Sequence, residues 1–134
     1  MGIHKDFVTE IKPLFVTGDG HYNLEVVGAP RCQKYLKMLD KHFLKQGGQQ
    51  ALIAKLHYEN CNPYDNKAIR VVINGGKVGY LLPGDAKLFR KRLERVGQEG
   101  AIIACNAIIT GGKRTWNFKK TAYDIRLDLP LSKL

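Results

Sequence analysis

The sequence predicts a mainly β fold, a small curled β-barrel with two packed helices. Segments with strand-like apolar patterns outnumber helical ones, at about six to two. Gly- and Pro-rich turns separate them at short intervals. Strands and helices do not alternate regularly, which argues against a Rossmann-like parallel sheet. The 134 residues are enough for one domain.

The first third of the chain is expected to supply an arm, a strand and a helix. Residues 1–20 combine an apolar stretch with a Gly-Asp-Gly turn, which predicts an N-terminal arm or an accessory strand. The remaining domain then spans residues 21–134. Residues 22–28 alternate as a strand does and end at a Gly-Ala-Pro turn. Residues 32–45 place apolar side chains at helical spacing with lysines opposite.

The middle third predicts three strands and a tight turn. Residues 51–58 alternate, with a lysine and a histidine on the face opposite the apolar side chains. Residues 68–73 and 77–82 flank Asn74-Gly75-Gly76. An Asn-Gly pair supplies the positive-φ residues that a two-residue hairpin turn requires, so these segments are expected to pair.

The last third predicts one helix followed by three strands. Residues 84–97 carry one apolar stripe that includes Val96. Residues 101–110 are apolar on both faces, which is typical of a central strand. Residues 114–118 and 121–129 complete the sheet, and the second of these segments alternates throughout its length.

The charge of the chain indicates the class of partner. It has 22 Lys and Arg against 12 Asp and Glu, a formal net charge of +10. Such an excess attracts polyanions through the summed field and through counterion release. The alternative is an ordinary solvated basic surface.

The sequence shows no sign of a membrane span, a disulfide framework or a metal site. No run of about 18 apolar residues is present, and the N-terminus lacks the apolar core of a secretory signal. Cys32, Cys61 and Cys105 are odd in number and widely spaced, so free thiols and a cytoplasmic location are expected. No Cys or His pair has zinc spacing, so neither a metal nor another cofactor is expected.

The most informative segment is 58–82. A polar loop with Asn62-Pro63-Tyr64-Asp65 leads into Ala68-Ile69-Arg70-Val71, and Val78-Gly79-Tyr80-Leu81 follows the glycine turn. These motifs, in this order, resemble the HIRAN domain. That small β-rich module is found at the N-terminus of SWI/SNF-type fork-remodelling translocases, where it binds the 3′ end of single-stranded DNA. The resemblance implies an OB-like barrel over residues 21–134, here as a stand-alone domain without a motor.

The resemblance also implies roles for particular residues. Tyr64 and Tyr80 are expected to stack on bases. Asp65 is expected to accept a hydrogen bond from the terminal 3′-hydroxyl, whereas a 3′-phosphate would place two anions against each other. Arg31 and Arg70 are expected to neutralise phosphates.

Each of these roles has a structural alternative. The two tyrosines are also consistent with half-buried core residues that keep hydrated hydroxyls. Asp65 is suited to capping its loop as an Asx turn. Arg70 either faces the groove or pairs with a surface acid, and Asn62 either holds the loop or contacts a phosphate.

The chain departs from the family pattern near Arg31. At the turn after the first strand the family often has a stacking aromatic residue, whereas this chain has Gly28-Ala29-Pro30-Arg31. The guanidinium of Arg31 can contact a phosphate or stack on a base as a substitute. Trp116, within a basic segment, either presents its ring at the groove or belongs to the core. The lysines and arginines of 84–97 form either a phosphate-binding stripe or a solvated face.

The sequence therefore predicts a non-catalytic module that binds single-stranded DNA, through its free 3′-hydroxyl end, in DNA repair or replication-fork processing. A helicase, nuclease or recombinase is the expected partner. One alternative is a protein-interaction or regulatory subunit whose groove holds a peptide or an acidic partner. A nuclease is the other alternative, but it requires clustered carboxylates for metal ions, and Asp65 has only Glu59 nearby in sequence. The choice between DNA and RNA and the oligomeric state stay open.

Overall fold

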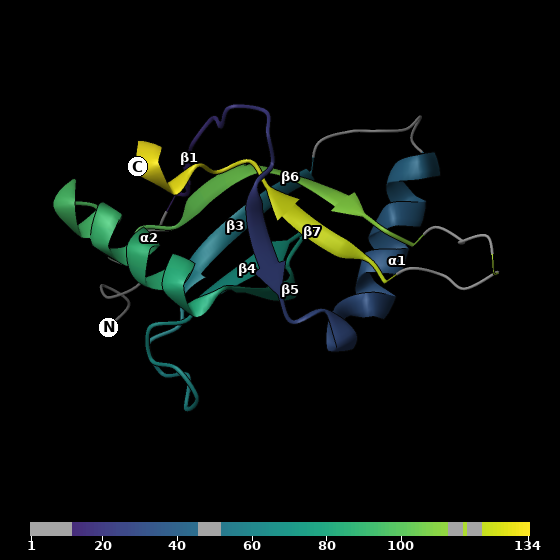
Figure 1. The fold of residues 1–134 in the computed structure, drawn as a ribbon, viewed down its shortest axis with the longest axis horizontal. Coiled ribbons are helices and arrows are strands. Elements are labelled where there is room, and N and C mark those ends of the chain that lie inside the picture. Colours follow the sequence, from purple (N-terminus) through teal and green to yellow (C-terminus); the bar gives the residue numbers. More distant parts are fainter. Residues whose placement is uncertain (1–11, 46–51, 113–116, 118–121) are drawn as a thin grey trace, which may run out of the picture.

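The described part of the chain folds into a closed barrel of six antiparallel strands with two α-helices, as a computed structural model shows (Figure 1). The structure describes residues 12–45, 52–112, 117 and 122–134, and leaves out the side chains of 29–31 and 43–45. The predicted fold class, a small OB-like barrel with two helices, is confirmed.

The strands are β1 (Leu14–Phe15), β2 (Leu24–Val27), β3 (Leu52–Tyr58), β4 (Ile69–Ile73), β5 (Gly76–Leu81), β6 (Ile103–Thr110) and β7 (Asp124–Leu127). The helices are α1 (Ala29–Lys45), α2 (Pro83–Arg95) and the short 3-10 helix η2 (Leu131–Lys133). Around the sheet the order is β1-β6-β3-β4-β5-β2-β7, and β7 pairs again with β6.

Strand β6 closes the barrel, because both of its edges are paired. Ala107 lies opposite Leu52 of β3 on one edge and opposite Leu127 of β7 on the other. The accessory strand β1 runs parallel to β6 and pairs with Ile103 and Ala104. At these two positions β3 pairs with one edge of β6, so β1 must pair with the other edge. This is the edge of β6 that pairs with β7 further along, so β1 takes no part in closing the barrel.

The β4–β5 hairpin forms as its turn residues predict. Ile73 pairs with Gly76, and the two residues between them have positive φ, 50° at Asn74 and 80° at Gly75. A hairpin turn of this kind matches the twist of the flanking strands. Tyr35 of α1 packs against this turn and donates its hydroxyl hydrogen bond to the Ile73 carbonyl at 2.6 Å.

A β-bulge in β5 changes which of its side chains face outward. Val71 pairs with Gly79 and Val72 pairs with Lys77, so Val78 is an extra residue without a partner in β4. Val78 is buried, whereas Lys77 is exposed. In a regular strand residues three apart point to opposite faces. Because of the bulge, Lys77 and Tyr80 instead lie on the same outer face.

The two helices lie at opposite ends of the barrel (Figure 1). In α2 the predicted apolar stripe is buried at Ala86, Phe89 and Leu93. Including Val96 in this stripe was wrong, because α2 ends at Arg95 and the Val96 side chain is 55% exposed.

Other boundaries differ from the predicted ones by a few residues. Helix α1 begins at Ala29, within the predicted Gly-Ala-Pro turn, because a proline is tolerated in the first turn of a helix. Strand β7 is shorter than the predicted 121–129. The strand predicted at 114–118 falls almost entirely outside the described residues. No helix in the described part of the chain has the length and apolar character needed to cross a membrane.

Candidate nucleic-acid interface

The loop between β3 and β4 is folded around the side chain of Asn62. The Oδ1 atom of Asn62 accepts hydrogen bonds from the backbone N–H groups of Tyr64 at 2.9 Å and Asp65 at 3.2 Å. The Nδ2 atom of Asn62 donates to Glu59 Oε1 at 2.9 Å. Asn62 therefore holds the loop, which is one of the two roles considered for it.

Asp65 forms the Asx turn considered as its structural role. Its Oδ1 atom accepts a hydrogen bond from the Lys67 backbone N–H at 2.9 Å. Its Oδ2 atom has no hydrogen-bond partner among the described residues. One carboxylate oxygen thus shapes the loop while the other stays available, so the turn does not prevent Asp65 from accepting a ligand hydroxyl.

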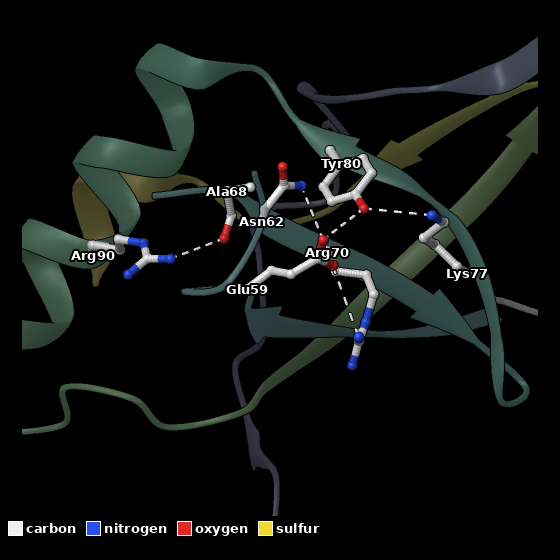
Figure 2. A network of polar contacts seen from close by, with 7 residues as sticks. All are labelled: Glu59, Asn62, Ala68, Arg70, Lys77, Tyr80 and Arg90. Atoms are coloured by element: carbon white, nitrogen blue, oxygen red, sulfur yellow. Dashed lines mark hydrogen bonds and ion pairs between the residues drawn. The ribbon is translucent and has the colours of Figure 1, made fainter. Parts of the chain in front are cut away.

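Arg90 of α2 fastens this loop to the barrel. Its guanidinium lies 4.4 Å from the centre of the Tyr58 ring, a cation–π contact. Its nitrogens donate hydrogen bonds of 2.7–3.3 Å to the backbone carbonyls of Lys67, Asn66 and Ala68 and to Oδ1 of Asn60. Figure 2 shows Arg90 reaching from α2 toward Ala68. Sequence reasoning placed Arg90 only on a basic stripe and missed this role.

The ring of Tyr64 projects from the loop into solvent. Its side chain is 97% exposed, although the backbone N–H of the same residue is bonded to Asn62. The half-buried core role considered for Tyr64 is therefore wrong. An aromatic ring on a fixed backbone and without packing partners is available to stack on a planar ligand.

Tyr80, Glu59 and Arg70 form a connected group beside the loop (Figure 2). The Tyr80 hydroxyl donates a hydrogen bond to Glu59 Oε1 at 2.9 Å. Arg70 Nη1 lies 3.8 Å from Glu59 Oε2, a long ion pair. The Lys77 ammonium lies 3.4 Å from the Tyr80 oxygen and 5.1 Å from the centre of its ring. Glu59, absent from the predicted site, joins the loop to the sheet.

A groove of about 770 Å³ covers the outer face of β3, β4 and β5. We call it the outer groove. Its lining residues are Ile53, Lys55, His57, Glu59, Arg70, Val72, Asn74, Gly75, Lys77 and Tyr80. Arg70 therefore takes both of its considered roles, since it faces this groove and also pairs with an acid. Its Nε atom is buried and has no hydrogen-bond partner within the described ranges.

The structure brings some of the predicted site residues together. Arg70 and Tyr80 line the outer groove, and Asn62 is linked to them through Glu59. Tyr64 and Asp65 lie on the adjoining loop and do not line the groove. The Arg31 side chain and Trp116 fall outside the described residues. Val27 pairs with Tyr80, so the chain enters α1 next to this ring.

Comparison of the chain with models of known families, with curated proteins and with solved structures gives no match. The resemblance to the HIRAN domain therefore stays a hypothesis. It rests on the three motifs between residues 62 and 81.

The outer groove has a positive electrostatic character. His57 is partly buried, and this burial, together with the positive charges of Arg70 and Lys55, lowers the pKa of its imidazole. These effects favour the neutral form of His57. Lys55 and His57 had been placed on the outward face of their strand, but the sequence did not show that β4 and β5 add further cations beside them.

The described residues include no group of metal-ligating side chains, and the thiol of Cys105 is unreactive. Among the described residues, no three His, Cys, Asp or Glu side chains are grouped closely enough to hold a metal ion. Burial, and then the charge of Asp128, raises the pKa of the Cys105 thiol to about 12. At neutral pH Cys105 is therefore protonated and a poor nucleophile.

Proposed function

We propose that this chain is a non-catalytic HIRAN-type module that binds single-stranded DNA at its free 3′ end. The observation that carries the proposal is the position of Tyr64 and Asp65 next to each other on one loop. The first presents a 97% exposed ring, and the second has a carboxylate oxygen that bonds to none of the described residues. A ring for the last base and an acceptor for its 3′-hydroxyl are what recognition of a strand end requires.

The rigidity of the loop supports this proposal. Asn62 and Arg90 fix its backbone through hydrogen bonds before any ligand arrives, and Glu59 holds the Asn62 side chain in place. Binding is tighter when the ordering of a loop does not have to be offset by the contacts formed. The net charge of +10 adds long-range attraction for a phosphate backbone.

In this proposal the module acts in the cytoplasm, in DNA repair or replication-fork processing, beside a helicase, nuclease or recombinase. Cys32, Cys61 and Cys105 are free thiols, which suits a reducing compartment. The barrel would hold the strand end while the partner acts on the rest of the DNA.

An Asp65→Asn variant tests recognition of the end. The wild type is expected to bind a 3′-hydroxyl oligonucleotide more tightly than the same strand with a 3′-phosphate, because the carboxylate accepts from the first and repels the second. A hydrogen bond to a charged group contributes about 1.5–3 kcal/mol, so the preference is expected to be about 10-fold or more. Asn keeps an oxygen for the Lys67 N–H but removes the charge, so the preference should shrink. Fluorescence anisotropy with labelled strands measures both affinities.

Two controls accompany this titration. Strands with a 5′-hydroxyl or a 5′-phosphate, and a common 3′-hydroxyl, should bind equally. RNA of the same sequence tests whether the sugar is distinguished. Equal wild-type affinity for 3′-hydroxyl and 3′-phosphate strands would contradict recognition of the end by Asp65. Weak binding that disappears at physiological salt, without any end preference, would favour the role of a protein-interaction subunit.

A further inference from the structure

The outer groove is larger than the capture of one terminal nucleotide requires. Strand register arranges its side chains in two rows across β3, β4 and β5. His57 pairs with Arg70, which pairs with Tyr80. Lys55 pairs with Val72, which pairs with Lys77. The bulge at Val78 completes both rows, because it allows Lys77 and Tyr80 to share this face.

The charges in these rows are not balanced within the groove. Glu59 is the single acid among the lining residues, and its ion pair with Arg70 is long, at 3.8 Å. Lys55 and Lys77 form no ion pair with any acid in the described part of the chain. A partly buried histidine placed directly opposite an arginine lowers stability when both are charged. Unbalanced cations of this kind are typical of a surface that binds an anion.

We propose that the outer groove binds the sugar-phosphate backbone of the nucleotides that precede the 3′-terminal one. Lys55, Arg70 and Lys77 contact phosphates, and the apolar side chains of Ile53 and Val72 contact sugars or bases. The proposal rests on the proposed function in one respect, because it takes the same single strand as ligand. It adds a second site with a different chemistry, which is independent of the free 3′-hydroxyl.

The dimensions of the groove suit this ligand. From Ile53 to Glu59 the strand advances six residues, at about 3.3 Å each, or about 20 Å. That length matches about six steps of a stacked strand at about 3.4 Å each, or fewer steps of an unstacked one. Tyr80 lies where the groove meets the 59–68 loop, since its hydroxyl is bonded to Glu59. A strand whose end is held at Tyr64 can therefore continue past Tyr80 into the groove.

Arg70 is placed to donate hydrogen bonds to a phosphate. Its side chain is 38% exposed, and among the described residues its Nη1 atom has only the long contact with Glu59. An arginine whose exposed nitrogens are weakly paired gains more from a phosphate oxygen than one whose donors are already satisfied.

The test compares strand length between two double variants. Lys55→Gln/Lys77→Gln removes two cations from the groove, and Lys87→Gln/Lys91→Gln removes two exposed cations from α2, outside the groove. Each is titrated with a 3′-hydroxyl trinucleotide and a 3′-hydroxyl dodecamer at several salt concentrations. All four substituted side chains are exposed, so both variants should fold, and circular dichroism checks this.

The groove variant is expected to bind the dodecamer more weakly and with a smaller salt dependence. The slope of log affinity against log salt is negative, and each lost phosphate contact reduces its magnitude by about 0.7 for single strands. The loss of two contacts reduces it by about 1.4. The affinity lost between about 50 and 200 mM salt is then about sevenfold smaller than in the wild type. The trinucleotide should be affected much less. The α2 variant loses only part of the long-range attraction, so its dodecamer affinity should fall much less than that of the groove variant.

The possible outcomes separate this inference from the proposed function. Wild-type binding of the dodecamer by the groove variant would overturn the groove site, as would an equal loss by both double variants. If the groove variant loses dodecamer binding while 3′-hydroxyl and 3′-phosphate strands bind alike, the groove site stands and the end-binding function fails. If no oligonucleotide binds the wild type, both fail.

Acidification provides a second test. His57 faces Lys55 on its own strand, Arg70 on β4, Lys77 and Tyr80 on β5, and Glu59. Burial and the neighbouring cations lower the pKa of His57, and a bound phosphate would raise it again. Binding therefore takes up a proton, so dodecamer affinity should increase severalfold as the pH falls from about 7.5 to 5.5. A His57→Gln variant should lose this increase, and an unchanged pH profile would contradict the inference.

Discussion

A Tyr64→Ala variant is expected to bind 3′-hydroxyl single strands about 5- to 150-fold more weakly than the wild type. This range corresponds to the contribution of about 1–3 kcal/mol that stacking of one base on an aromatic side chain makes. The free energy of unfolding should hardly change, because the side chain is 97% exposed and contributes no packing. Anisotropy titration and urea denaturation of the same sample measure the two quantities.

A Tyr64→Phe variant is the matched control for this prediction. Phe keeps the ring and removes the hydroxyl, so binding should stay close to that of the wild type if stacking is the interaction. If Tyr64→Phe lost as much affinity as Tyr64→Ala, the hydroxyl and not the ring would account for the binding. Wild-type affinity in Tyr64→Ala would show that the exposed ring is not used for binding, which would remove the main support for an end site on this loop.

Local patterns in the sequence were sufficient to predict most of the barrel. Alternation in 51–58 predicted β3, because one face of that strand is buried in the core and the other faces solvent. Asn74-Gly75 predicted the β4–β5 hairpin, because its turn requires two positive φ values. These features depend on neighbouring residues only, which is why a sequence pattern contains them.

The outer groove could not be predicted in this way. It requires the register of three strands and one bulged residue, Val78, which decides that Lys77 and Tyr80 share a face. Arg90 likewise reaches the loop only because α2 packs against the end of the barrel near Ala68. Sequence position shows that Glu59 precedes the loop but not that its carboxylate binds Asn62 and Tyr80. Contacts over such sequence separations depend on the whole fold.

The close approach of two strands explains why the Val-Gly-Tyr-Leu motif has a glycine at position 79. At Gly79, β5 passes so close to β2 that an added Cβ would lie 2.2 Å from the Val27 carbonyl oxygen and 2.8 Å from a methyl carbon of Val26. Its φ of 153° also lies in a region that side chains with a Cβ rarely adopt. The glycine of this motif is therefore explained by the close approach of two paired strands.

A Gly79→Ala variant is accordingly expected to lose about 2–5 kcal/mol of stability, from backbone strain and from the clash with β2. That loss is a large part of the 5–15 kcal/mol typical of a folded domain. Binding should weaken as well, because Val27 pairs with Tyr80 and a displaced β2 would move this ring. Urea denaturation monitored by circular dichroism measures the loss.

Alanine substitutions at two other glycines serve as controls for the loss of stability in Gly79→Ala. Gly84 in α2 has open space around it and no positive φ, so Gly84→Ala should leave stability unchanged or raise it by up to about 1 kcal/mol. Gly75 also has open space but a φ of 80°, so Gly75→Ala should cost about 1–2 kcal/mol from backbone strain alone. The excess of the Gly79 effect over the Gly75 effect then combines the clash between β5 and β2 with the greater strain of a φ of 153°. If Gly79→Ala were as stable as Gly84→Ala, the close approach of these paired strands would be wrong, and with it the position of Tyr80 at the junction of loop and groove.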